Sequence, residues 1–235
     1  MRWGQGEPRP FVIGGPTTPA VRTLLTVNVV IFLFQALAQA LVHVRLDRLF
    51  GLVPYEVIHH LFLWQLGTYM FLHGGLLHIL LNMLTLWMFG GELEALWGTK
   101  RFVRFYFITG IGAAIMTTLV TPNSYVPTIG ASGAIYGLLA AYGILFPDRV
   151  LLLYFVLPVK AKFLVLFLGL LTFWSSLTAT GGGVAHVAHL GGMIFGWLYL
   201  RGPKWPRSGL PFRDAYERWR KDRLRKKFKV YYHHT

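Results

Sequence analysis

The class of fold is decided by residues 21–42, VRTLLTVNVVIFLFQALAQALV. The only charged side chain in this stretch is Arg22, near its start. Crossing the hydrocarbon core of a bilayer takes about 20 mostly apolar residues in a helix. The stretch lacks the small-residue cleavage site and the mature soluble domain that accompany a secretory signal. It therefore predicts a transmembrane helix that is retained.

Five more apolar runs follow, each long enough to cross or nearly cross a bilayer. They cover residues 76–91, 102–121, 131–146, 163–180 and 184–200. A shorter run, residues 150–157, ends at Pro158, and we place it at the start of the fifth helix or at the membrane interface. The predicted fold is an all-α polytopic membrane protein with six transmembrane helices.

The composition agrees with a membrane protein and excludes several other classes. Of the 235 residues, 54% are hydrophobic and 14% are charged, whereas a soluble domain has about 25% charged residues. The apolar content also excludes a disordered chain. Because the sequence has no cysteine, a disulfide scaffold, a cysteine nucleophile and a thiolate zinc site are excluded.

The positive charge is concentrated and predicts an orientation. Residues 201–235 hold 12 of the 23 Lys and Arg residues and 3 of the 9 Asp and Glu residues. Six spans place both termini on one side of the membrane, and 21 of the 23 basic residues then fall on that side. Only Arg45 and Arg48 fall on the other. Because positive loops stay in the cytoplasm, we predict cytoplasmic termini and a plasma-membrane location.

The chain accordingly divides into three parts. They are a cytoplasmic segment (residues 1–20), a membrane domain (residues 21–200) and a basic cytoplasmic tail (residues 201–235). The tail is expected to lie on anionic lipid. The alternative partners of the tail are nucleic acid and an adaptor protein. Of these, nucleic acid is not expected. The first outer loop, residues 43–72, is rich in aromatic side chains and predicts an interfacial element against the helices.

Three groups of polar residues interrupt the predicted spans. They are His78 and Asn82 in the second, Ser132 in the fourth, and His186 and His189 in the sixth. Polar groups in hydrocarbon are costly and usually face the interior of the bundle. The second, fourth and sixth helices all run from the outer to the inner side, so these residues share a depth near the outer leaflet. They form one candidate site.

A serine beside a histidine base is the minimum for nucleophilic acyl transfer. No Asp or Glu stands in the outer half of any span to orient the imidazole, so packing must do so. Asn82 and His78 are candidate side-chain donors to an oxyanion, and the backbone N–H of Ser132 at a helix start is another. No cofactor is required.

Each motif also has a simpler interpretation. A helical serine often only bonds to the preceding turn, and Asn82 could be a helix–helix contact. Histidines at these spacings suit zinc. The sequence has neither His-Glu-x2-His nor a nearby carboxylate, so no metal site is expected. Spacing alone does not decide whether His186 or His189 is the base.

Together the motifs resemble the rhomboid family of intramembrane serine proteases, across about residues 60–200. The Gly-x-Ser-Gly motif appears as Gly130-Ala131-Ser132-Gly133, and the Ala-His-x-Gly-Gly motif as Ala188-His189-Leu190-Gly191-Gly192. The second span matches with His73, His78 and Asn82, and the stretch into the third with Glu94, Gly98, Phe102 and Tyr106. The family's usual Trp-Arg pair is Trp64-Gln65 here, a departure that concerns stability or lipid contact.

The resemblance to the bacterial six-helix type implies a role for each residue. Ser132 would be the nucleophile and His189 the general base and then acid. The oxyanion hole would comprise Asn82, His78 and the backbone N–H of Ser132, with that of Ile129 or Gly130. Tyr136 would stack on the histidine, and Gly133 and Gly137 would pack against Gly192 and Gly196. His186 would make a structural hydrogen bond, and His73 would hold the first loop at the membrane boundary.

The implied function is that of a serine endopeptidase that cleaves transmembrane segments of membrane proteins, with its site open to the outer face. The alternative is a catalytically inactive relative that binds membrane-protein clients. A small transporter would require an intramembrane charge or broken helices in repeated halves, and the sequence has neither.

Overall fold

The computed structural model describes residues 17–153, 157–178 and 184–202. The expectations for residues 1–16 of the cytoplasmic segment and for the basic tail from residue 203 onward fall outside this part of the chain.

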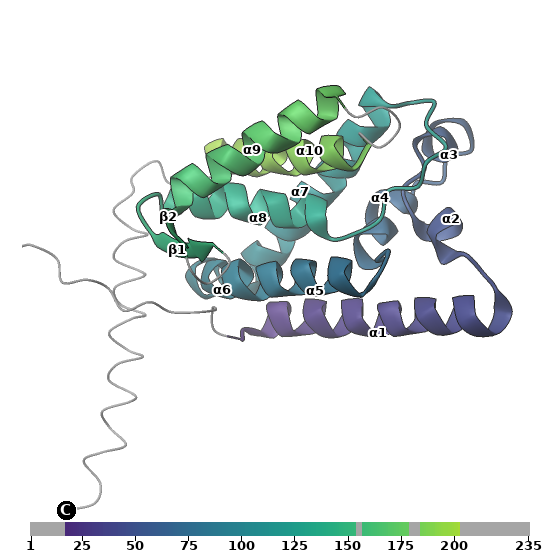
Figure 1. Ribbon diagram of the computed structural model, residues 1–235, viewed down its shortest axis with the longest axis horizontal. Coiled ribbons are helices and arrows are strands. Elements are labelled where there is room, and N and C mark those ends of the chain that lie inside the picture. Colours follow the sequence, from purple (N-terminus) through teal and green to yellow (C-terminus); the bar gives the residue numbers. More distant parts are fainter. Residues whose placement is uncertain (1–16, 154–156, 179–183, 203–235) are drawn as a thin grey trace, which may run out of the picture.

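The described chain is mostly helical, and each of the six predicted runs overlaps a helix over most of its length (Figure 1). The helices are α1 (Pro19–Val42), α2 (Leu46–Phe50), α3 (Pro54–His59), α4 (Gln65–Thr68), the 3₁₀ turn η1 (Tyr69–Phe71), α5 (Leu76–Thr85), the π-helical η2 (Leu86–Gly90), α6 (Gly91–Trp97), α7 (Thr99–Val120), α8 (Ser132–Leu145), α9 (Ala161–Thr178) and α10 (Val184–Arg201). Three of the described helical stretches are long and apolar enough to cross a membrane: α1, the continuous α5–η2–α6 and α7. Helices α8 and α9 are apolar and shorter.

The all-α expectation is wrong at residues 150–160. Strand β1 (Val150–Leu153) pairs with β2 (Leu157–Lys160) in an antiparallel hairpin, and α9 begins only afterwards, at Ala161. Pro158 has no N–H to donate and disfavours a helix interior. In a two-stranded hairpin its ring is tolerated, and it pairs with Leu152. The run is therefore not the start of the fifth helix.

Glu94 joins the beginnings of two long helices. Its carboxylate accepts hydrogen bonds from the backbone N–H groups of Ala20 and Val21 at 2.9 Å each, and from the hydroxyl of Thr18. It also accepts from the Thr99 hydroxyl at 2.7 Å. The first N–H groups of a helix lack an acceptor within it, and an anion suits that end. The buried carboxylate thus fixes the start of α1 beside the start of α7.

Glu94→Gln is expected to destabilise the fold by about 2–4 kcal/mol, because an amide offers one acceptor oxygen to four donors and aims an NH₂ group at them. Unfolding of the purified protein in mixed micelles measures the loss. Asp148→Asn is the matched control, since its carboxylate is 68% exposed beside Lys162 and should contribute under about 1 kcal/mol. Equal stability of the two variants would contradict the assigned role of Glu94.

Helix α10 packs against α7 and α8 along surfaces of small residues. A Cβ atom on Gly192 would lie 1.8 Å from the carbonyl oxygen of Gly133, and one on Gly196 would lie 3.0 Å from that of Gly137. The backbones of α8 and α10 therefore touch, as small residues at such spacings allow. This contact sets the distance between the side chains that the two helices carry.

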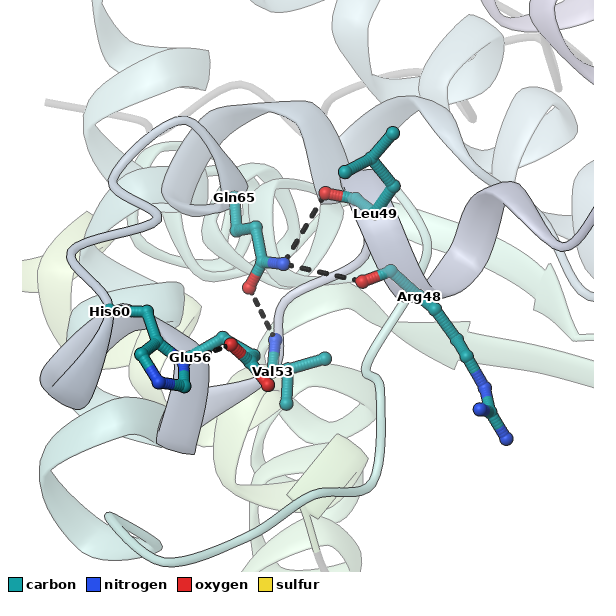
Figure 2. Close-up of polar contacts among 6 residues, drawn as sticks. All are labelled: Arg48, Leu49, Val53, Glu56, His60 and Gln65. Atoms are coloured by element: carbon teal, nitrogen blue, oxygen red, sulfur yellow. Dashed lines mark hydrogen bonds and ion pairs between the residues drawn. The ribbon is translucent and has the colours of Figure 1, made fainter.

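The first loop is a folded element at one end of the molecule, with the hairpin at the opposite end (Figure 1). Leu52 and Thr128 exchange backbone hydrogen bonds of 2.9 and 2.8 Å, which tie the loop to the segment that precedes α8. Gln65 is fully buried, and its side chain accepts from the N–H of Val53 at 2.9 Å and donates to the carbonyl of Leu49 at 3.3 Å (Figure 2). The Gln65 departure thus falls on a residue that organises the loop.

Candidate active site

Ser132 is the first residue of α8, and its hydroxyl Oγ lies 2.8 Å from Nε2 of His189 on α10. The first intrahelical hydrogen bond of α8 runs from the N–H of Ile135 to the carbonyl of Ala131. The N–H groups of Ser132 and Gly133 therefore have no acceptor within the helix. The serine combines a hydroxyl on an imidazole with a backbone donor at a helix start.

The imidazole of His189 is held by packing against an aromatic ring. The ring of Tyr136, one turn after Ser132, stacks on it with centroids 4.2 Å apart and planes 3° apart. The His189 Nδ1 atom is buried and has no hydrogen-bond partner among the described residues. In this part of the chain the histidine is thus oriented by a stacked ring and by its serine contact.

The geometry distinguishes the two histidines that the sequence left as alternatives. The rings of His186 and His189 meet edge to face, with centroids 6.1 Å apart. Of the two histidines, only His189 forms a hydrogen bond with Ser132 in the described structure. The structural hydrogen bond expected for His186 is not found there, because its Nδ1 is buried without a partner within residues 17–153, 157–178 and 184–202.

His78 and Asn82 on α5 face the backbone just before Ser132. Gly130 has φ +123°, which favours glycine, and a Cβ there would lie 2.7 Å from Nε2 of His78 and 3.8 Å from Nδ2 of Asn82. The Nδ1 atom of His78 accepts from the N–H of Gly74 at 3.3 Å. In a neutral imidazole this leaves the proton on Nε2. Both side chains thus present N–H donors beside Gly130.

Among the backbone N–H groups considered for the oxyanion hole, the N–H of Gly130 already donates a hydrogen bond within the protein. Its N–H donates to the carbonyl of Tyr69 at 2.9 Å, so it cannot turn to a ligand without losing that bond. Gly130 was one of two alternatives for an additional backbone donor, and in this structure its N–H is already used. The N–H of Ser132 has no such competitor within its helix.

His73 lies beside the site and is linked to α1. Its N–H donates to Oε1 of Gln35 at 3.0 Å, and its ring is edge to face with that of His78 at 5.1 Å between centroids. Burial, with a smaller effect of the neighbouring His78, lowers the pKa of His73 to about 4. His73 is therefore neutral near pH 7 and adds no charge to the site.

These residues together suit acyl transfer. They supply a hydroxyl on an imidazole nitrogen, a ring that fixes that imidazole, and N–H groups converging beside the serine. No three His, Cys, Asp or Glu side chains are placed to hold a metal ion in the described segments.

A family model of the rhomboid domain matches residues 60–202, more than half of the chain. This chain belongs to the rhomboid family. Membership implies a polytopic helical membrane protein, in agreement with the long apolar helices. The matched range contains every residue of the candidate site, and it contains Glu94.

Several curated relatives are similar to this rhomboid chain. Rhomboid protein 1, mitochondrial, of Saccharomyces cerevisiae is 33% identical over 135 residues, which is 55% of this chain and 38% of the relative. RHOMBOID-like protein 1 of Arabidopsis thaliana is 34% identical over 158 residues, covering 65% and 38%. Rhomboid protease GluP of Bacillus subtilis is 31% identical over 150 residues, covering 62% and 27%. The chain therefore spans well under half the length of these relatives.

The structure also identifies residues that no sequence motif indicated. Tyr69 is buried, its hydroxyl donates to the carbonyl of Gly110 at 2.7 Å, and its own carbonyl holds Gly130. Gln35 bonds the turn that contains His73. Gln35 could have been noticed as a polar residue in an apolar span. Tyr69 gave no such signal, because an aromatic in an apolar loop is ordinary.

Proposed function

We propose that this chain is an intramembrane serine endopeptidase of the bacterial six-helix rhomboid type. It crosses the plasma membrane six times with both termini in the cytoplasm, and it cleaves transmembrane segments of other membrane proteins. The orientation is supported by the charge distribution, since 21 of 23 basic residues fall on one side of the proposed six spans. The catalytic proposal is supported above all by the 2.8 Å contact between Ser132 Oγ and His189 Nε2.

The proposed reaction starts with Ser132 and His189. As Oγ attacks the scissile carbonyl carbon, its proton passes to Nε2 of His189. The carbonyl oxygen becomes an oxyanion, which accepts hydrogen bonds from His78, Asn82 and the N–H of Ser132. The imidazolium then gives its proton to the departing amine nitrogen, which leaves an acyl group on Ser132.

The second half reaction releases the acyl group. Water attacks the ester carbon while His189 takes its proton, and a second tetrahedral species forms at the same donors. Collapse of this species returns the proton to Oγ and frees the new carboxyl end of the substrate. Because His189 has no carboxylate partner among the described residues, the stacked ring of Tyr136 is what keeps Nε2 directed at the serine in both halves.

Covalent labelling tests this proposal most directly. A fluorophosphonate probe should label the purified protein at Ser132, and Ser132→Ala should remove the label. Ser124→Ala is the control and should keep the label, because Ser124 lies in the loop before α8, where its hydroxyl accepts a hydrogen bond from the N–H of Val126. An intact wild-type protein without label and without cleavage of a single-span substrate would favour the client-binding alternative.

Asn82→Ala is expected to lower kcat for a single-span substrate by about a hundredfold, since loss of one oxyanion donor costs about 10²–10³. The unfolding temperature of the protein should change little. His78→Ala should have a similar effect on kcat through its Nε2 donor. Steady-state cleavage in detergent measures both.

Asn123→Ala is the matched control for Asn82, because Asn123 is exposed in the loop before α8. It should cleave at the wild-type rate. If Asn82→Ala instead kept full kcat with a lowered unfolding temperature, Asn82 would be only a helix contact, bonded to the carbonyl of His78 at 3.0 Å.

A further inference from the structure

The two arginines on the proposed outer face line the same pocket. The pocket has a volume of about 290 Å³, and its walls are Arg45, Arg48, Val53, Glu56, Tyr125 and Pro127. Basic residues are disfavoured on the outer side of a membrane protein. That both of them lie in one cavity, three residues apart, indicates a specific use for their charge.

The charged side chains that line the pocket differ in whether they already have an ion-pair partner. Arg45 is paired with Asp47 at 2.6 Å. Arg48 is exposed, and its guanidinium has no hydrogen bond or ion pair within the described residues. Glu56 also lines the pocket, and its carboxylate is 2.5 Å from Nδ1 of His60 and remains 27% exposed. The cavity is therefore lined by a guanidinium group that is unpaired in the described structure and by a partly exposed carboxylate.

The walls are held by buried hydrogen bonds. Gln65 accepts from the N–H of Val53 and donates toward the carbonyls of Arg48 and Leu49, at 3.5 and 3.3 Å. Figure 2 shows the side chain of Arg48 directed away from Gln65, with Val53 between Arg48 and Glu56. The Tyr125 wall is fixed because the N–H of Tyr55 donates to the carbonyl of Ser124. A pocket fixed in this way loses little entropy when it binds a ligand.

The pocket also has an aromatic ring in its lining, and exposed apolar residues stand near its arginines in the sequence. The ring of Tyr125 is 63% exposed and stacks on that of Tyr55 with centroids 4.2 Å apart. Next to the arginines in the sequence, Val44 and Leu49 are each 48% exposed, and Leu41 near the end of α1 is 75% exposed. These apolar side chains suit acyl chains, while the arginines suit a headgroup.

We infer that this pocket binds the headgroup of a zwitterionic phospholipid with a primary amine, such as phosphatidylethanolamine, from the outer leaflet. The phosphate lies on Arg48 with Arg45 beside it, as guanidinium groups favour phosphate oxygens. The ammonium lies between the carboxylate of Glu56 and the ring of Tyr125. Its place in the outer leaflet depends on the proposed orientation, whereas the charge match does not.

Lipid binding to the full chain in detergent, followed by native mass spectrometry, tests the inference. Dioleoyl phosphatidylethanolamine should bind about tenfold more tightly than dioleoyl phosphatidylglycerol, which has the phosphate but no amine. Arg48→Gln should weaken both lipids by about tenfold. Glu56→Gln should abolish the preference for the amine while leaving phosphatidylglycerol binding unchanged.

Arg104→Gln is the matched control, because it removes an exposed arginine of α7 that does not line the pocket, and it should bind both lipids like the wild type. Equal binding of the two lipids by the wild type, or an unchanged Arg48→Gln protein, would overturn the inference. Competition by glycerophosphoethanolamine at equal concentration would also overturn it, since the site would then take a soluble phosphoester. None of these results depends on protease activity, so they leave the proposed function to its own test.

Discussion

Ser132→Ala is expected to lower the cleavage of a single-span substrate by at least about 10⁴-fold, since a serine hydrolase without its nucleophile keeps only a small residual activity. His189→Ala should cause a loss of the same order, because Oγ would have no base 2.8 Å away. The double variant should be no slower than either single variant, as residues that act as one unit are not additive. Initial rates at saturating substrate, with the unfolding temperature of each protein, measure this.

His186→Ala is the control for His189→Ala. Both residues lie on α10, and their rings are 6.1 Å apart between centroids, but only His189 is hydrogen-bonded to the serine in the described structure. His186→Ala should therefore keep activity within about tenfold of the wild type and should still be labelled by a fluorophosphonate. A larger loss of activity in His186→Ala than in His189→Ala would contradict the assignment of His189 as the base.

Gly192→Ala is expected to destabilise the protein by about 3 kcal/mol and to remove most of its activity. The new Cβ would lie 1.8 Å from the carbonyl oxygen of Gly133, so α8 and α10 must move apart. These two helices carry the serine and the histidine, and a displacement of about 1 Å can cost about a hundredfold in rate. Unfolding in mixed micelles and kcat together measure the two effects.

Two other glycines calibrate this result. A Cβ on Gly196 would lie 3.0 Å from the Gly137 carbonyl, so Gly196→Ala should have a smaller effect of the same kind. Gly67 lies in α4, where a Cβ meets nothing within 4 Å, and Gly67→Ala should be close to the wild type in stability and rate. If Gly192→Ala were as stable and active as Gly67→Ala, the close approach of the helices would not be what sets the serine–histidine distance.

The positions of the helices could be predicted because bilayer-length apolar runs are a local property of the sequence. The run 21–42 coincides with α1 to within two residues at its start, and the run 102–121 with α7 to within three. The hairpin at residues 150–160 was missed because a short apolar run reads alike as helix, strand or interface. Its pairing of Leu152 with Pro158 is a contact between two segments, which the pattern does not contain.

The sequence by itself determined the mostly helical membrane class, the candidate residues and their family, because spacing along a helix fixes which side chains share a face. Only the tertiary structure decided which histidine touches Ser132, since His186 and His189 lie almost on the same face of α10. It also decided that the N–H of Gly130 donates its hydrogen bond to the carbonyl of Tyr69. The physical reason is that both outcomes depend on distances between segments, and backbone contacts such as that of Gly192 with Gly133 set those distances.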